Sequence, residues 1–289
     1  MNMASRCSIA FAGQGVIVEY DGAKGAEVVE LLFRTVVKRY EGASPVDLRV
    51  AERAGVASLF RADDQTISNH QTVGTLALTI LSACTEIFKQ RNVETVVFHA
   101  AALAYRGGAI LLPGVSGAGK STLTAWLLTR EFAHLTDELA SVHEGRVEGL
   151  SRAIHLRRGA HELFSSRIEA IYNQAKVATT PEGIVACPTV FSSLGASAPT
   201  DLRAIVFPNY VPGAAISLDR LSQAECSWRL FGQLMNLANF PDRCFKAVTA
   251  IGRAFPAYSL RYGSFGGLDL MLAGLIDGSS RSTRVDALQ

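Results

Sequence analysis

The sequence has no strong excess of charge of either sign. Its 289 residues include 28 Lys and Arg and 26 Asp and Glu, which gives a formal net charge of +2. A charge this small does not indicate a surface for nucleic acid or for a membrane, so we expect neither among the partners. With 48% hydrophobic and 19% charged residues, the chain has a globular composition. Its length allows one good-sized core, or a core with a small second domain.

The sequence also lacks paired cysteines and long apolar runs. The five cysteines are Cys7, Cys84, Cys187, Cys226 and Cys244, and no two form a C-x-x-C pair. An odd, scattered set favours reduced thiols over a disulfide framework. No run of about 18 apolar residues is present, and the first residues contain no long apolar segment. We therefore expect a soluble, cytoplasmic protein.

The feature that is present is a glycine-rich motif near the middle of the chain. Residues 114–122 read G-V-S-G-A-G-K-S-T and fit G-x-x-x-x-G-K-[ST], the P-loop pattern. The apolar run 109–113 predicts a buried strand before it, and residues 121–128 predict a helix after it. A strand, loop and helix in this order direct backbone N–H groups and the positive end of a helix at one point, where phosphate binds.

We therefore predict a nucleotide site at this motif. Lys120 is expected to reach the β- and γ-phosphates, and the Ser121 hydroxyl is expected to ligate Mg²⁺. The alternative, a chance match in a chain with 25 glycines, is disfavoured by the flanking strand and helix. The candidate nucleotide-binding residues are Gly114, Val115, Ser116, Gly117, Ala118, Gly119, Lys120, Ser121 and Thr122.

Hydrophobic patterning predicts an α/β protein in two parts. Residues 1–70 are expected to form a small N-terminal α/β domain, and residues 71–277 a catalytic domain that contains the P-loop. The polar tail, residues 278–289, is expected to be disordered. In the first part the predicted strands are 16–20, 48–50 and 57–61, and the predicted helix is 27–40. Asp63 and Asp64 are interpreted as a solvated turn.

In the second part, a helix at 72–90 is followed by a strand at 95–105, which a Gly-Gly turn joins to the P-loop strand as a hairpin. Residues 174–200 are interpreted as a long loop with one strand at 184–186. The other predicted strands are 133–136, 140–142, 147–150, 153–156, 202–208, 214–218 and 257–262, and the other predicted helices are 161–172, 222–236, 242–255 and 268–276.

Two adjacent acids and one histidine accompany the P-loop. Asp137 and Glu138 lie 17 and 18 residues after Lys120, at the end of a short strand, and His99 lies 15 residues before Gly114. In an ordinary ATPase the metal-side acid ends a long apolar strand much further along the chain. The best such strand here, 204–207, carries no acid. No transporter-type L-S-G-G-Q segment is present either.

In these residues the chain resembles HPr kinase/phosphorylase, a bacterial serine kinase related in fold to ATP-dependent phosphoenolpyruvate carboxykinase. The close pattern covers about 40 residues, from His99 to Glu138, and a weaker likeness extends to about residue 262. The chain looks most like the shorter HPr kinase-related proteins, some of which accompany peptide-modification clusters. The resemblance implies a P-loop kinase core of this type, a mixed sheet with flanking helices, beside a small N-terminal α+β domain.

The resemblance also implies a role for each matching residue. Lys120 would hold the phosphates and Ser121 the Mg²⁺. Asp137 would take the proton of the acceptor hydroxyl, with ligation of Mg²⁺ as its alternative role. Glu138 would be a carboxylate on the Mg²⁺ side, and His99 would neighbour the base. Phosphoryl transfer requires this combination of positive charge, metal and a carboxylate near the nucleophile. Bland alternatives are a core histidine for His99 and a strand-end cap for Asp137.

The sequence departs from the family in three places. Glu138 replaces an aspartate, the E-V-R-G-L-G-I signature is only echoed at 147–152, and the R-P-G-R-N element is absent, with 258–263 in the comparable region. In the family, the missing parts handle HPr docking and phosphorolysis. The resemblance is therefore not taken to imply HPr as the substrate or the reverse reaction. Arg152 and Arg261 are candidate phosphate clamps, with surface salt bridges as the alternative.

Four histidines show no spacing typical of a metal site and are expected on the surface or in turns: His134, His143, His155 and His161. Taken together, the residues predict an ATP- and Mg²⁺-dependent kinase acting on a hydroxyl, most readily a serine of a small protein or peptide. Two alternatives remain: a nucleotide-binding switch or ATPase module without kinase activity, and a kinase of small-molecule hydroxyls. A base beside the phosphate site favours the kinase. A homo-oligomer is left open.

Overall fold

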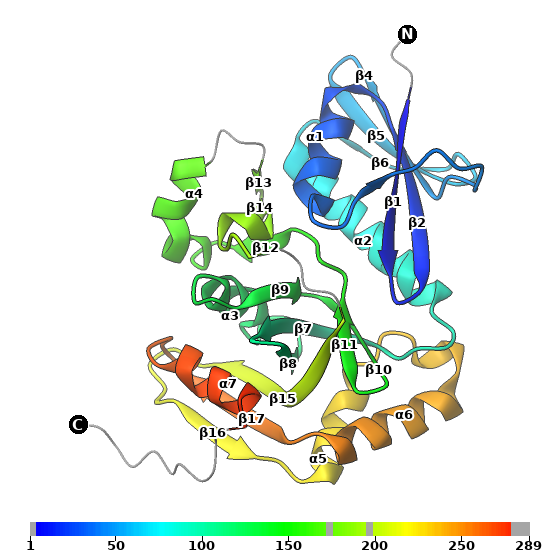
Figure 1. Cartoon of the computed structure of the whole chain (residues 1–289). Coiled ribbons are helices and arrows are strands. Elements are labelled where there is room, and N and C mark those ends of the chain that lie inside the picture. Colours follow the sequence, from blue (N-terminus) through cyan, green and yellow to red (C-terminus); the bar gives the residue numbers. More distant parts are fainter. Residues whose placement is uncertain (1–3, 172–175, 195–198, 279–289) are drawn as a thin grey trace.

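The computed structural model describes residues 4–171, 176–194 and 199–278 (Figure 1). Within these residues the protein is a mixed α/β structure with three sheets and seven α-helices. None of the helices in the described ranges is both long and apolar enough to cross a membrane. The tail that was expected to be disordered lies outside the described residues, apart from residue 278.

The N-terminal sheet has the strand order β3-β1-β2-β4-β5-β6. Two of its hairpins turn at an alanine followed by a glycine, Ala12-Gly13 and Ala54-Gly55, and all four residues have positive φ angles. Tight turns of this kind match the twist of paired strands. The strands are β1 (Ser5–Phe11), β2 (Gln14–Tyr20), β3 (Lys38–Arg39), β4 (Leu48–Arg53), β5 (Val56–Arg61) and β6 (Thr66–His70).

The predicted strands of this part are present, but the helix predicted at 27–40 begins five residues earlier and ends seven residues earlier than expected. Helix α1 is Gly22–Phe33, and the chain then turns so that β3 pairs with β1. The helical periodicity continued through Val36 because Val36 and Val37 also pack against the core, although from a non-helical segment. Strands β1 and β6 were missed, since their pairing partners rather than their own sequence define them.

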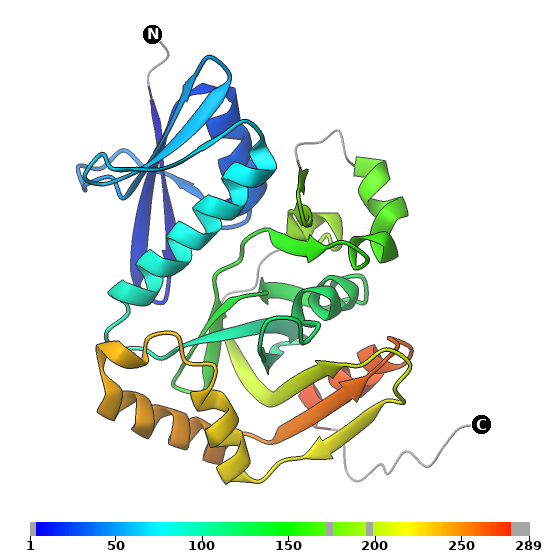
Figure 2. The ribbon, with the colours of Figure 1, turned by 180° about the vertical axis from the view of Figure 1, so that it is seen from behind.

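Helix α2 (Val73–Arg91) connects the N-terminal sheet to the rest of the molecule. The predicted helix at 72–90 is confirmed, and Thr72 caps it by accepting a hydrogen bond from the N–H of Thr75. Its buried residues, among them Leu76, Ile80 and Phe88, share one core with the N-terminal sheet. Figure 2 shows α2 lying along that sheet, on the side that faces the remaining elements.

The central sheet has the order β11-β10-β7-β8-β15-β17-β16, with β9 paired to β7. The hairpin before the glycine motif is confirmed: β7 and β8 are antiparallel and turn at Arg106-Gly107, both with positive φ. Strands β8, β15 and β17 run parallel to one another. The strands are β7 (Val97–Tyr105), β8 (Gly108–Pro113), β9 (Ala133–Thr136), β10 (Leu139–His143), β11 (Arg146–Gly149), β15 (Thr200–Tyr210), β16 (Ser217–Arg220) and β17 (Ala257–Tyr262).

Helices cover both faces of the central sheet, which explains why β8 is apolar throughout. Ile110 and Leu112 pack with α3 (Lys120–Leu128) and α7 (Leu268–Ile276), whereas Ala109 and Leu111 pack with α5 (Gln223–Phe231) and α6 (Pro241–Ala254). Side chains alternate across a strand, so a strand covered on both faces has no polar positions to offer. The predicted helix 222–236 is shorter than expected and ends at Phe231.

A small third sheet, β12-β14-β13, lies near the glycine motif. Its strands are β12 (Ile154–Arg157), β13 (Val177–Thr180) and β14 (Gly183–Ala186). The strand expected at 184–186 is present, but the interpretation of its surroundings as a long loop was wrong, because β13 pairs with it as a hairpin. The helix predicted at 161–172 begins as a 3₁₀ turn, His161–Phe164, and continues as α4 (Ser165–Ile171).

Candidate functional site

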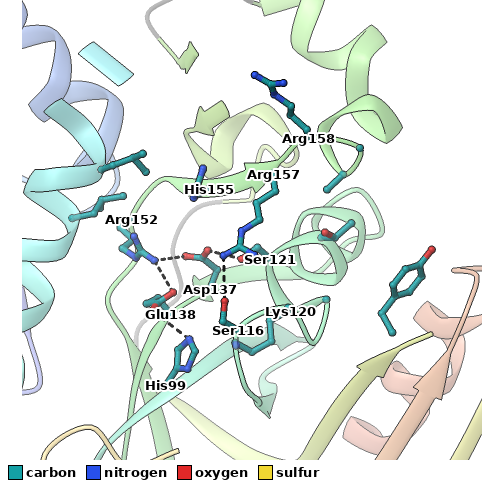
Figure 3. Close-up of a pocket in the computed structure, with 18 of the residues that line it drawn as sticks. His99, Ser116, Lys120, Ser121, Asp137, Glu138, Arg152, His155, Arg157 and Arg158 are labelled. Atoms are coloured by element: carbon teal, nitrogen blue, oxygen red, sulfur yellow. Dashed lines mark hydrogen bonds and ion pairs between the residues drawn. The ribbon is translucent and has the colours of Figure 1, made fainter. Parts of the chain in front are cut away.

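A pocket of about 670 Å³ opens where the strands β8, β15 and β17 end. Ligands of open parallel sheets bind at the carboxyl ends of the strands, so the location is the expected one. The glycine loop (residues 114–119), α2, the segment after β9 and the end of β12 all contribute side chains to the pocket. Figure 3 shows Ser121, Asp137, Glu138 and Arg152 pointing toward one another at its centre, whereas Arg158 points away.

The glycine loop joins β8 to α3, as the motif predicted. Gly117 and Gly119 have φ angles of +88° and +92°, which side-chain-bearing residues rarely adopt. A Cβ atom on Gly119 would also lie 2.5 Å from the hydroxyl oxygen of Tyr262. Gly119 is therefore required both by its backbone conformation and by the space around it. The first N–H groups of α3 face the loop, as phosphate binding requires.

Lys120 is the first residue of α3 and is almost fully buried, with 6% of its surface exposed. Its Nζ donates hydrogen bonds to the carbonyl oxygens of Gly114 and Val115, the latter at 3.1 Å. Burial lowers the pKa of Lys120, whereas Glu138 and Asp137 oppose that shift. The ammonium group is thus held over the loop, inside the pocket.

Asp137 follows β9 and is 1% exposed. Its Oδ2 accepts a hydrogen bond of 3.1 Å from the Oγ of Ser121, the second residue of α3. Its Oδ1 has no hydrogen-bond partner within the described part of the chain, although it is buried. Burial raises the pKa of the Asp137 carboxyl, while the nearby Arg152 guanidinium opposes that shift. A buried carboxylate oxygen without a hydrogen bond needs a positive charge nearby, and the Arg152 guanidinium, 3.5 Å from Oδ1, supplies one.

Glu138 lies at the same turn but points to another set of partners. Its Oε1 is 3.3 Å from Nε2 of His99, and its Oε2 is 3.2 Å from Nη2 of Arg152. The side chain of Glu138 is 33% exposed, far more than that of Asp137. The Oγ1 of Thr136 accepts the N–H groups of Glu138 and Leu139, which fixes the turn that separates the two carboxylates.

His99 and Arg152 connect the two carboxylates to the sheet. The N–H of His99 donates to the carbonyl of Gln233, so the backbone of His99 is fixed from a distant segment. Burial lowers the pKa of His99, and Glu138 opposes this shift. Arg152 is buried, and its Nη2 lies 3.5 Å from Oδ1 of Asp137 and 3.2 Å from Oε2 of Glu138. One guanidinium therefore balances both acids.

Sequence reasoning missed two arginines at the end of β12. Arg157 and Arg158 both line the pocket, and Nη2 of Arg157 donates to Oγ of Ser116 at 3.3 Å. Arg157 thereby holds a second positive charge above the glycine loop (Figure 3). The available signal was an Arg-Arg pair directly after the predicted strand 153–156. The sequence alone does not show that this pair lies at the glycine loop, because the pairing of β12 in the third sheet places it there.

The structure brings most of the predicted site residues into this one pocket. They are His99, Ser116, Gly117, Gly119, Lys120, Ser121, Thr122, Asp137, Glu138 and Arg152. Gly114, Val115 and Ala118 belong to the loop without lining the pocket as described, and Val115 is exposed. Arg261, a predicted phosphate clamp, is exposed on β17 and does not line it, because the strand's alternation turns it away while Tyr262 faces in.

Two histidine predictions were wrong. His134 was expected at the surface, but it is buried on β9, and its Nδ1 lies 3.1 Å from Oγ of Ser151. Burial lowers its pKa to about 3. His155 was also expected on the surface or in a turn, yet it is half-buried on strand β12 and lines the pocket. Strands β9 and β12 have four residues each, which is too few for the sequence pattern to indicate which face is buried.

The donor set fits a magnesium nucleotide without a cage of protein ligands. No group of three or more His, Cys, Asp or Glu side chains within the described ranges could hold a metal ion by itself. Mg²⁺ at nucleotide sites needs only one or two protein oxygens in addition to phosphate oxygens and waters. The Ser121 hydroxyl and the Asp137 carboxylate, which are hydrogen-bonded to each other and both line the pocket, could supply them.

Comparison with known proteins gives little that bears on this pocket. No family model matches the chain, and no curated protein matches it. Among solved structures, the HPr(Ser) kinase/phosphatase from Coxiella burnetii is similar at 13% sequence identity and a TM-score of 0.32. The match covers 63% of this chain and 89% of that chain. A TM-score and an identity this low do not identify the function of the pocket.

Proposed function

We propose that this protein is an ATP- and Mg²⁺-dependent kinase that transfers the γ-phosphoryl group to a hydroxyl, with a serine of a small protein or peptide as the preferred acceptor. The observation that carries the proposal is the hydrogen bond between Ser121 and Asp137 beside the buried Lys120. It joins a phosphate-binding loop to a carboxylate, which is the combination that phosphoryl transfer uses.

The nucleotide half of the site consists of the loop and two cations. Backbone N–H groups of the loop and of the first turn of α3 would hold the phosphate chain, and Lys120 would contact the β- and γ-phosphates. Arg157, held at Ser116, would add a guanidinium on the opposite side of the phosphates. Ser121 and Asp137 would hold Mg²⁺, which when bound neutralises charge on the phosphate oxygens.

The acceptor half of the site is assigned to Glu138 and His99. The sequence resemblance implies Asp137 as the base, but Asp137 is hydrogen-bonded to Ser121 at the nucleotide end of the pocket and is much less exposed than Glu138. Glu138 is 33% exposed and adjoins His99, so an incoming hydroxyl can approach it. A base must lie within hydrogen-bond reach of the proton that it takes, which favours Glu138.

These groups account for the bond that forms, the bond that breaks and the proton that moves. The acceptor oxygen attacks the γ-phosphorus, the bond from that phosphorus to the β–γ bridging oxygen breaks, and ADP leaves. The proton of the acceptor hydroxyl passes to Oε1 or Oε2 of Glu138. Nε2 of His99 lies 3.3 Å from Oε1 and can accept a hydrogen bond from the protonated Glu138 carboxyl. Arg152 keeps both carboxylates in position and offsets their mutual repulsion.

The acceptor class is supported by the likeness of residues 99–138 to the serine kinase pattern. A small-molecule kinase would use the same named residues, and a nucleotide-binding switch would need Lys120 and Ser121 but not the Glu138–His99 pair. The presence of that pair in the pocket supports the kinase over the switch.

The test is a labelling experiment. The protein is incubated with γ-labelled ATP, Mg²⁺ and the proteins or peptides encoded next to its gene, and the labelled product is identified together with its modified residue. We expect phosphoserine in one product and none with Lys120→Ala. Release of labelled inorganic phosphate alone would support the switch, and a labelled metabolite would support the small-molecule kinase.

A further inference from the structure

Three aromatic rings line one end of the pocket and have no part in the chemistry above. They belong to Tyr210, Tyr262 and Phe265, at and just beyond the ends of the parallel strands β15 and β17. Tyr210 and Tyr262 are register partners on these neighbouring strands. Tyr210 is 41% exposed, which is unusual for a large aromatic side chain beside a fixed loop.

Two of these residues, Tyr210 and Tyr262, lie directly against the glycine loop. The N–H of Tyr210 donates to the carbonyl of Ala118 at 3.2 Å, and the hydroxyl of Tyr262 donates to the carbonyl of Gly119 at 3.4 Å. A Cβ atom added to Gly119 would lie 3.0 Å from Cβ of Tyr210. Tyr210, through its backbone and Cβ, and Tyr262, through its hydroxyl, therefore adjoin the loop residues that immediately precede Lys120.

The rings also contact one another, and Tyr210 is the one that stays partly exposed. Tyr262 meets Tyr210 edge-on, with ring centroids 5.4 Å apart, and meets Phe265 in the same way at 5.8 Å. Phe265 in turn stacks on Trp126 of α3 at 5.4 Å. Tyr262 is buried, whereas Tyr210 remains partly exposed to the pocket. The ring of Tyr210 is thus in contact with the buried ring of Tyr262 on one side and is not covered by it.

Contacts also give the order of groups along the pocket. Tyr210 adjoins Ala118 and Gly119, which Lys120 and Ser121 follow in sequence. Ser121 is hydrogen-bonded to Asp137. Arg152 contacts both Asp137 and Glu138, and Glu138 contacts His99. The aromatic end thus lies away from the carboxylates, with the phosphate-binding loop between them. A nucleotide whose γ-phosphate points at the carboxylates would have its base at the aromatic end.

We propose that Tyr210 is the platform on which the base of the bound nucleotide stacks. The inference rests on the proposed function, because it takes the loop to be the phosphate site. Stacking on an aromatic face is favourable for every base, since each has a π-face. The rings at this end carry no charged group, and the Tyr262 hydroxyl is already engaged with Gly119. The platform therefore selects a purine or pyrimidine nucleotide over a bare phosphate chain, with little preference among bases.

Calorimetry with two probes separates the platform from the phosphate site. Inorganic diphosphate with Mg²⁺ reports the loop alone, and ADP with Mg²⁺ reports loop and base together. We expect Tyr210→Ala to weaken ADP binding about 10- to 100-fold, the size typical of one base–aromatic stack, and to leave diphosphate within about twofold. GDP should show the same loss. Tyr210→Phe, which keeps the ring, should retain ADP affinity.

Further variants keep the test decisive. Tyr210→Leu retains apolar bulk without a π-face and should behave like Tyr210→Ala, even if the alanine variant does not fold. Trp228→Ala removes another exposed aromatic, 79% exposed on α5 and outside the pocket, and should change neither affinity. The platform is overturned if Tyr210→Leu leaves ADP binding unchanged, if diphosphate binding falls equally, or if the loss is confined to one base. A wild type that binds diphosphate no more weakly than ADP also overturns it, whereas a wild type that binds neither refutes the phosphate site itself.

Discussion

The Oγ of Ser121 donates a 3.1 Å hydrogen bond to Oδ2 of Asp137, and this contact joins the glycine loop's helix to the strand on the other side of the pocket. Ser121 is the second residue of α3 and Asp137 follows β9 directly, so two elements meet at one buried carboxylate. The second oxygen of that carboxylate has no hydrogen bond and lies 3.5 Å from Nη2 of Arg152, and in the function proposed above Ser121 and Asp137 together would hold Mg²⁺.

The first prediction concerns Asp137→Asn. The amide can still accept the Ser121 hydrogen bond, but it has no negative charge to offer Mg²⁺. We expect the Mg²⁺ concentration for half-maximal activity to rise at least about tenfold, with metal-free nucleotide binding little changed. Titration of activity with Mg²⁺ measures this, and Asp242→Asn, exposed on α6, is the matched control. An unaltered metal requirement with a large fall in rate would make Asp137 the base instead.

The second prediction concerns Glu138→Gln. The variant keeps the shape of the side chain next to His99 and Arg152 but cannot take the proton of the acceptor. We expect kcat to fall about 10²- to 10⁴-fold while Mg²⁺·ATP affinity stays within a few-fold. Steady-state kinetics and calorimetry check the two quantities separately. Glu144→Gln, on the exposed β10–β11 turn, should leave both unchanged. Equal losses of rate and nucleotide affinity would place Glu138 on the metal side.

The third prediction concerns Lys120→Ala. Loss of the ammonium removes a charge-assisted contact to the β- and γ-phosphates, for which we expect about 2–3 kcal/mol of nucleotide affinity, or about 30- to 150-fold. Turnover should fall with it while the fold is retained. Lys246→Ala, exposed on α6, supplies the control. Calorimetry that showed normal ATP binding by Lys120→Ala would remove the phosphate site from this loop.

The glycine motif and the acid pair could be predicted from sequence because their chemistry is local. Strand, turn and helix follow one another within residues 108–128, and Asp137 and Glu138 follow the next strand directly. The hairpin before the motif was equally readable, since Arg106-Gly107-Gly108 permits the positive φ angles of a tight turn.

What the sequence could not provide depends on contacts between distant segments. Arg157 reaches the loop only because β12 pairs with β14, and Tyr210 reaches it because β15 and β17 lie side by side. The wall that α2 contributes, with Leu78 and Thr85, likewise follows from how α2 packs between the N-terminal sheet and the third sheet. The burial of His134 belongs to the same class, because a strand of four residues does not reveal its covered face.

The fourth prediction compares two glycines of the loop. Gly117→Ala and Gly119→Ala both place a side chain at positive φ, which costs about 1–2 kcal/mol. Only at Gly119 would the new methyl group also meet the hydroxyl of Tyr262, at 2.5 Å, whereas nothing lies within 4 Å of it at Gly117. We expect Gly119→Ala to be the more destabilising by about 1–3 kcal/mol in urea unfolding, and to weaken nucleotide binding more. Equal effects would show that the loop moves away from Tyr262 freely.

The last prediction concerns acid and the buried His134. Burial, aided by the charge of Arg152, lowers its pKa from 6.5 to about 3. The unfolded chain therefore binds a proton at this residue below about pH 6.5 that the folded protein does not bind until about pH 3. Stability contributed by neutral His134 is present above pH 6.5 and is lost as the pH falls toward 3, by up to about 1.4 kcal/mol per pH unit.

Urea unfolding across this pH range tests the point through its slope, not through the stability at one pH. Other groups titrate in the same range, so the comparison is between proteins: His134→Gln should lose less stability per pH unit than the wild type, even if it is less stable throughout. His143→Gln is the control, because His143 is exposed and should leave the slope unchanged. Identical slopes in the wild type and His134→Gln would mean that His134 is protonated in the folded state, with its unpartnered Nε2 reached by water.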